Sequence, residues 1–205
     1  MLPLLRCSSI VLAAFFLSVT SVPVSANGEV AYQKAKASFG AGDSKKAANW
    51  LQRAVSQGHS AARLPLAAMY RDGVGVRQNL KMAYKLFKVS AEEGYPSAQY
   101  GLAELYRLGE GVDRDWVKSM QWYRRAALQA DAAAQNSLGV VYEYGRGVRS
   151  NYALARMWYN IAGINGSKRG ERNKERVVRK MKPHEVEMSM KLSAVCLASN
   201  YKDCG

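Results

Sequence analysis

Apolar and polar positions along the chain recur with a period of 36 residues, without a gap, from about Asp43 to Gly166. Within each period, apolar residues spaced four apart, as in Ala98, Leu102 and Tyr106, place one stripe on a first α-helix. Such a period predicts stacked helical units. Six columns are identical in three successive units: Ala62, Ala98, Ala134; Leu66, Leu102, Leu138; Tyr70, Tyr106, Tyr142; Gly73, Gly109, Gly145; Gly75, Gly111, Gly147; Val76, Val112, Val148.

The ends of the predicted helices follow the same period. A glycine closes each first helix, where a left-handed residue without Cβ is favoured. After a short Gly-x-Gly-Val loop, an Asp or Asn is expected to cap a second helix, since its side-chain oxygen accepts from first-turn amides. These predicted N-caps are Asp43, Asn79, Asp115 and Asn151, and the second helices end at Gly58, Gly94, Ala130 and Gly166.

The second helix alternates small and bulky columns. Two bulky columns contain aromatic residues in most units, and their regular spacing favours a packed core between units over a carbohydrate-binding platform. Small columns let neighbouring helices approach closely. The columns are Ala47, Ala83, Ser119, Ala155; Trp50, Leu86, Trp122, Trp158; Leu51, Phe87, Tyr123, Tyr159; and Ala54, Ser90, Ala126, Ala162.

Residues Ala83 to Val112, Ser119 to Val148 and, more loosely, Ala47 to Val76 resemble Sel1-like repeats, which are related to tetratricopeptide repeats. The resemblance rests on the Trp122-Tyr123 pair, the Ala-x-x-Gly ending at Gly94, the Ala98-Gln99 opening and the Leu-Tyr-x-x-Gly-x-Gly-Val close. It implies an all-α fold, a right-handed α-solenoid of antiparallel helix pairs. It also implies binding of a protein partner.

Four segments are expected along the chain. They are a signal peptide (residues 1–26), a capping hairpin resembling a tetratricopeptide unit (27–58), Sel1-like repeats (59–166) and C-terminal capping helices (167–205). The last segment is predicted to form a closing helical hairpin, with Pro183 at a first helical position. Pro65 replaces the small residue of later units and predicts a kinked or late first helix.

The N-terminal segment predicts export. Arg6 precedes an apolar run from Ile10 to Val19, and Val24-Ser25-Ala26 fits a cleavage site after Ala26. The run is shorter than a spanning helix requires, although an uncleaved membrane anchor is the alternative. We therefore expect a periplasmic or secreted protein of a Gram-negative bacterium.

Two cysteines, Cys196 and Cys204, remain after removal of this segment, which contains Cys7. An even pair in an exported chain favours a disulfide, with two free thiols as the alternative.

The sequence lacks the residue patterns of catalytic and metal sites. His59 and His184 are far apart, without zinc-ligand spacing, and His59 is expected to be a solvated turn residue. Phosphate-loop and nucleophile-elbow motifs are missing. We therefore expect no cofactor, no metal and no enzymatic activity.

Two surfaces are candidates for partner binding. Variable columns on the first helices, spaced four and three apart, predict an exposed binding stripe, with an ordinary solvated face as the alternative. This predicted stripe consists of Leu64, Ala68, Arg71, Tyr100, Glu104, Arg107, Asn136, Val140 and Glu143. A predicted basic patch, with an ordinary solvated cap helix as the alternative, consists of Lys168, Arg169, Arg172, Lys174, Arg176, Arg179, Lys180 and Lys182.

The formal charge of +14, lowered by one when the predicted signal peptide leaves with Arg6, favours acidic partners. Export argues against nucleic acid. The sequence therefore predicts a non-enzymatic adaptor that binds a protein in the envelope or outside the cell. The alternative is a structural subunit of an envelope machine, of the flagellar motor type, whose basic patch binds an anionic cell-wall polymer or lipid surface.

Overall fold

The computed structural model describes residues 26–204, and within that range it contains α-helices, one short 3₁₀ helix and no strand. The predicted signal peptide lies outside the described residues except for Ala26, at which the first helix begins. The helices are α1 (Ala26–Gly40), α2 (Ser44–Ser56), α3 (Arg63–Asp72), α4 (Leu80–Glu92), α5 (Pro96–Leu108), α6 (Trp116–Ala127), α7 (Ala132–Tyr144), α8 (Tyr152–Ile164), α9 (Lys168–Val178) and α10 (Pro183–Ala198).

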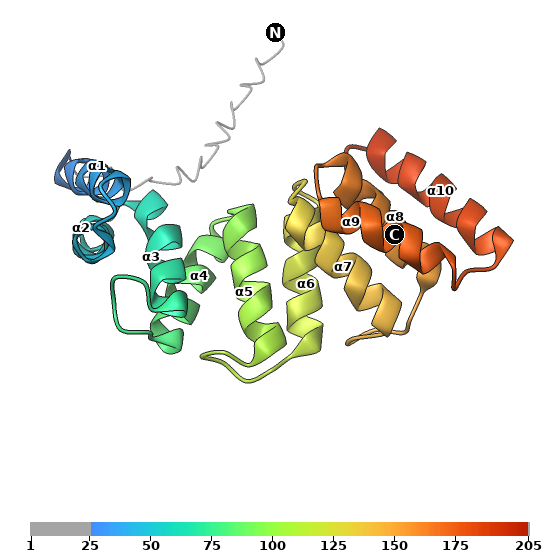
Figure 1. Cartoon of the computed structure of the whole chain (residues 1–205), viewed down its shortest axis with the longest axis horizontal. Helices are drawn as coiled ribbons and strands as arrows, with labels where there is room; N and C mark the ends of the chain where they lie inside the picture. Colours follow the sequence, from blue (N-terminus) through green and yellow to red (C-terminus); the bar gives the residue numbers. More distant parts are fainter. Residues whose placement is uncertain (1–25, 205) are drawn as a thin grey trace, which may run out of the picture.

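The helices form a curved row that runs from α1 at one end to α10 at the other (Figure 1). From α1 to α9, each helix packs mainly against its neighbours in the chain. The two helices of each pair, α1 with α2, α3 with α4, α5 with α6 and α7 with α8, are joined by a short loop and pack against one another. The predicted all-α solenoid of antiparallel helix pairs is therefore confirmed.

The four predicted Asx caps are all present. Each side-chain oxygen accepts from the backbone amide three residues later, at 2.9 to 3.0 Å. The predicted glycines that end α3, α5 and α7 are also confirmed, because Gly73, Gly109 and Gly145 adopt left-handed φ values of 71°, 77° and 64°. Helix boundaries in the repeats thus follow from local chemistry.

The second glycine of each loop has a different role, which is contact with the preceding helix pair. A Cβ on Gly75 would lie 2.2 Å from the Ser44 carbonyl oxygen, and one on Gly111 would lie 2.2 Å from that of Leu80. Both glycines also have φ of +71° or +72°. The loop therefore packs directly on the first turn of the previous second helix, which sets the spacing between pairs.

In three of the helix pairs, a hydrogen bond joins two side chains that are 30 residues apart in the sequence. Arg63 donates to Glu93 at 2.6 Å, Gln129 donates to Gln99 at 2.9 Å, and Asn165 donates to Gln135 at 2.9 Å. In each pair, the start of the first helix is thereby joined to the turn that follows the second helix.

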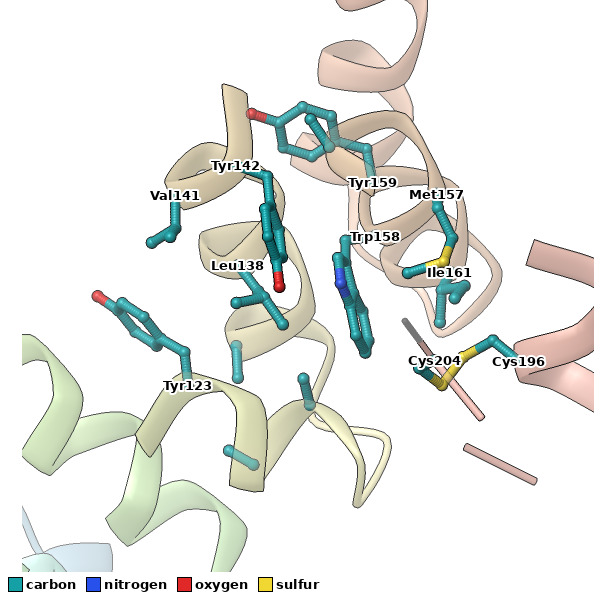
Figure 2. Packing of buried hydrophobic residues seen from close by; sticks show 14 of the residues in the cluster. Tyr123, Leu138, Val141, Tyr142, Met157, Trp158, Tyr159, Ile161, Cys196 and Cys204 are labelled. Atoms are coloured by element: carbon teal, nitrogen blue, oxygen red, sulfur yellow. A yellow bond between two sulfur atoms is a disulfide. The ribbon is translucent and has the colours of Figure 1, made fainter. Parts of the chain in front are cut away.

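The column of Leu51, Phe87, Tyr123 and Tyr159 is buried in the core, as predicted, whereas in the neighbouring column Trp158 is buried and Trp50, Leu86 and Trp122 are partly buried against the core. In the C-terminal half, Tyr123, Trp158 and Tyr159 are fully buried. Figure 2 shows Trp158 between Leu138 of α7 and the Cys196–Cys204 disulfide. This bond confirms the predicted cysteine pairing, and both cysteines are buried in the same cluster.

The effect of Pro65 agrees with the expected late start. A 3₁₀ turn, Ser60–Ala62, precedes α3, which begins at Arg63, whereas α5 begins at Pro96 in the corresponding unit. The proline therefore lies in the first turn, where its missing N–H has no helical partner to lose.

The predicted closing hairpin is wrong in its packing. Helices α9 and α10 each pack against α8 and have little contact with one another. The cause is α8, which buries apolar residues on both sides, including Met157 and Ile161 as well as Trp158 and Tyr159. A helix that is apolar all round must be covered on both faces.

The expectation for His59 is also wrong. Its side chain is buried, stacks on Tyr32 with ring centroids 4.4 Å apart, and lies 2.8 Å from a Glu29 oxygen. The turn between α2 and α3 is covered by α1, which the repeat pattern alone does not reveal.

Candidate functional site

The face built by the first helices contains a small hollow between α5, α6 and α7. Its volume is about 200 Å³, and four residues of the predicted stripe line it. Spacing of four and three along α5 directs its stripe residues to the same side of that helix. The lining is Tyr100, Glu104, Arg107, Trp116, Tyr123, Ser137, Val140, Val141, Arg146 and Arg169. We refer to it as the α5–α7 pocket.

One wall of the α5–α7 pocket is a closed polar network around Glu104. Arg107 donates to its carboxylate from Nε at 3.1 Å and from Nη2 at 2.7 Å, and the Tyr123 hydroxyl donates to Oε1. Burial and the nearby Glu104 charge raise the pKa of the Tyr123 phenol, so it stays a hydrogen-bond donor. The network fixes α5 against α6.

Another part of the lining combines Arg146 with the aromatic ring of Trp116. The Arg146 guanidinium lies 4.8 Å from the centre of the Trp116 ring and 5.5 Å from that of Tyr144. Trp116 is the first residue of α6, and Arg146 stands between the two glycines of the α7–α8 loop. The cap at Asp115 and the two turns at Gly145 and Gly147 therefore position this pair.

Glu143 is not an exposed stripe residue, and this part of the prediction is wrong. Its side chain is 0% exposed and accepts from the Tyr159 hydroxyl at 2.8 Å, from Nη1 and Nη2 of Arg176 at 2.6 Å each and from Nζ of Lys180 at 3.0 Å. α9 covers it, supplying Arg176 and, just beyond its last residue, Lys180. Burial alone raises the pKa of the Glu143 carboxyl, but these hydrogen bonds outweigh burial, and its pKa lies below the ordinary 4.5.

The remaining stripe residues lie outside the α5–α7 pocket. Leu64 and Ala68 pack against the core around α3, α4 and α5. Arg71 forms two hydrogen bonds with Asp72, at 2.7 and 2.9 Å, and Asn136 accepts from Asn173 at 2.9 Å. The predicted stripe is therefore half-buried, and its members converge only at the pocket.

The predicted basic patch is partly used inside the protein. Arg176 and Lys180 bind Glu143, and Lys174 lies 3.4 Å from the Asn160 side-chain oxygen. Arg169 lines the α5–α7 pocket. The exposed members are Lys168, Arg169, Arg172, Arg179, Lys180 and Lys182.

Trp116 and Arg146 line the pocket but were not predicted from the sequence. Arg146 is the middle residue of a Gly-x-Gly loop, where the other units have Val74 and Glu110. Variation at that position between otherwise constant glycines is the signal that was available.

None of the described helices is long and apolar enough to cross a membrane. Within residues 26–204, no group of three or more His, Cys, Asp or Glu side chains is arranged to hold a metal ion. The α5–α7 pocket lining contains neither histidine nor cysteine.

Several solved structures are similar to the chain, including the following two. One is c5321, a protective antigen present in uropathogenic Escherichia coli strains that displays an SLR fold, with 24% identity and a TM-score of 0.59. The match covers 85% of this chain and 47% of that protein, so the chain spans about half its length. The other is a Sel1 repeat protein from Oxalobacter formigenes, with 35% identity, a TM-score of 0.54, and coverage of 61% of this chain and 94% of that one.

A search of curated proteins gives no match. The family model of the Sel1 repeat matches residues 30–59, 61–95, 96–131 and 132–167, which together are more than half of the chain. Its first match includes most of the segment interpreted above as a capping hairpin. Sel1 repeats generally mediate protein–protein interaction. The chain belongs to the Sel1 repeat family.

Proposed function

We propose that this protein is a non-enzymatic adaptor that binds a partner protein at the α5–α7 pocket, in the bacterial envelope or outside the cell. One observation supports this most strongly. Residues from four helices and a loop, among them Tyr100, Trp116, Arg107 and Arg146, line a single hollow on the first-helix face. Tryptophan, tyrosine and arginine are the residues that most often dominate protein–protein binding energy.

The rigidity of the pocket walls supports the same proposal. Glu104 is bonded to both Arg107 and Tyr123, and the Arg146 guanidinium lies close to two aromatic rings. Side chains that are already ordered lose less conformational entropy when a partner arrives. The hollow is thus suited to take an anchor side chain from a partner.

The proposed location outside the cytoplasm is supported by the apolar N-terminal segment and by the buried Cys196–Cys204 disulfide. Structural disulfides persist mainly in oxidising compartments. N-terminal sequencing of protein from a periplasmic extract is expected to begin at Asn27. A first residue at Met1 in that extract would contradict cleavage after Ala26.

Site-specific photo-crosslinking in intact cells tests the binding face. A photoreactive residue at Val140, in the α5–α7 pocket, is expected to give one dominant adduct identifiable by mass spectrometry. The matched control is Val89, which is exposed on the second helix α4 and is expected to give no adduct of that mass. Equal adducts at both positions, or an adduct at Val89 alone, would contradict the proposal.

The surface-binding alternative has less support. It depends on the basic patch, and Glu143 pairs with Arg176 and Lys180, so its negative charge offsets part of the positive charge of that patch. It predicts salt-sensitive sedimentation with anionic liposomes or isolated cell wall. That behaviour, together with no crosslink at Val140, would favour it over the adaptor.

A further inference from the structure

The charges that line the α5–α7 pocket do not balance. Glu104 is its only acidic residue, and it faces Arg107, Arg146 and Arg169. The two oxygens of Glu104 already accept from Arg107 and Tyr123. Within residues 26–204, neither Arg146 nor Arg169 forms an ion pair with a carboxylate. Two cations are therefore available to a bound group.

The two cations reach the pocket from different elements. Arg146 belongs to the α7–α8 loop, and its guanidinium is held near Trp116 and Tyr144 by cation–π contacts. Such contacts use the face of the guanidinium and leave its N–H donors free for a carboxylate. Arg169 extends from the first turn of α9, which the Glu143 ion pairs hold against α7.

The size of the hollow indicates what kind of anion it takes. At about 200 Å³ it is smaller than the roughly 300–1,000 Å³ of pockets that enclose a free small molecule. Tyr100 and Val140 give it an apolar wall. One side chain of a larger partner fits these limits better than an independent ligand.

Building on the proposed function, we propose that the α5–α7 pocket takes a glutamate or aspartate side chain from an acidic segment of the partner protein, bound jointly by Arg146 and Arg169. The formal charge of +14 favours approach of such a segment, since long-range attraction raises association rates. Arg107 keeps its bond to Glu104 and holds the wall in place.

A binding assay with a defined peptide tests this inference. The probe is a dye-labelled peptide with blocked ends in which glutamates flank one leucine, and its isostere has glutamine at every glutamate. Fluorescence anisotropy with the purified full chain is expected to show binding of the acidic peptide and at least about tenfold weaker binding of the isostere.

Two double variants locate the effect. R146Q/R169Q is expected to weaken binding of the acidic peptide by about tenfold or more. R149Q/R172Q removes the same charge from the exposed arginines three residues further along the same loop and helix, and is expected to change binding by less than about twofold. R169Q alone changes only an exposed residue, so a loss of binding in this variant does not come from an effect on folding.

Three outcomes would overturn the inference: no binding of the acidic peptide, equal binding of the isostere, or equal losses in both double variants. Equal losses would indicate attraction to net charge alone. Failure of the proposed function is detected separately, as the absence of the Val140 crosslink. A Val140 adduct that persists in R146Q/R169Q would keep the adaptor proposal and reject the acidic anchor.

Discussion

Ala130 adopts a left-handed φ of 63° in the turn after α6, where Gly58, Gly94 and Gly166 end the corresponding second helices. The backbone of an L-residue is strained there by about 1–2 kcal/mol. Glycine removes this strain, but it loses more conformational entropy on folding, and this loss offsets part of the gain. We predict that A130G raises the free energy of unfolding by about 0.5–1 kcal/mol, measured by urea denaturation. A destabilised A130G would contradict this account of the turn.

Whether a residue's role can be predicted from the sequence depends on how far along the chain its partners lie. Asp43, Asn79 and Gly109 act on backbone groups a few residues away, so their roles follow from local sequence. Glu143 and His59 bond to residues 33 and 30 positions away, and their burial depends on tertiary packing. The caps are therefore predictable from the sequence, whereas the prediction that the Glu143 and His59 side chains lie in solvent is wrong.

At the scale of elements, the spacing of helix pairs depends on loop glycines that touch the preceding pair. We predict that G111A destabilises the protein by about 1–3 kcal/mol more than G94A. Both glycines have positive φ, but a Cβ at Gly94 meets no atom within 4 Å, whereas one at Gly111 meets the Leu80 carbonyl. Equal losses in thermal or urea unfolding would show that the contact does not matter.

The attachment of α9 is predicted to depend on pH through Glu143. Its folded-state pKa is lowered, so the native protein binds fewer protons than the unfolded chain, and this stability is lost as pH falls through the folded pKa. We predict that E143Q lowers the free energy of unfolding by about 1–3 kcal/mol at neutral pH.

The acid dependence provides the check on this prediction. Between about pH 5 and pH 3, wild-type stability is expected to fall more steeply than that of E143Q. E175Q, at an exposed glutamate of α9, is the matched control and should follow the wild type. Parallel acid slopes for wild type and E143Q would contradict the assignment.

At the scale of the whole molecule, the period of 36 residues was sufficient to predict a solenoid of helix pairs, because each repeat buries its neighbours' aromatic columns. The C-terminal end was harder to predict. There α8 is covered by both α9 and α10, and the repeat pattern fades after Gly166. The pocket was only half predictable, since the stripe on α5 was visible in sequence but Trp116 and Arg146 meet it only through the fold.

The most direct test of the account is to fill the α5–α7 pocket and measure partner capture. S137W places a large side chain in the hollow, and A133W places the same side chain one turn earlier on α7, at an exposed position. With equal thermal stability confirmed for both, S137W is predicted to lose the partner crosslinked through Val140 and A133W to retain it. Full capture of that partner by S137W would show that the pocket is not where the protein binds.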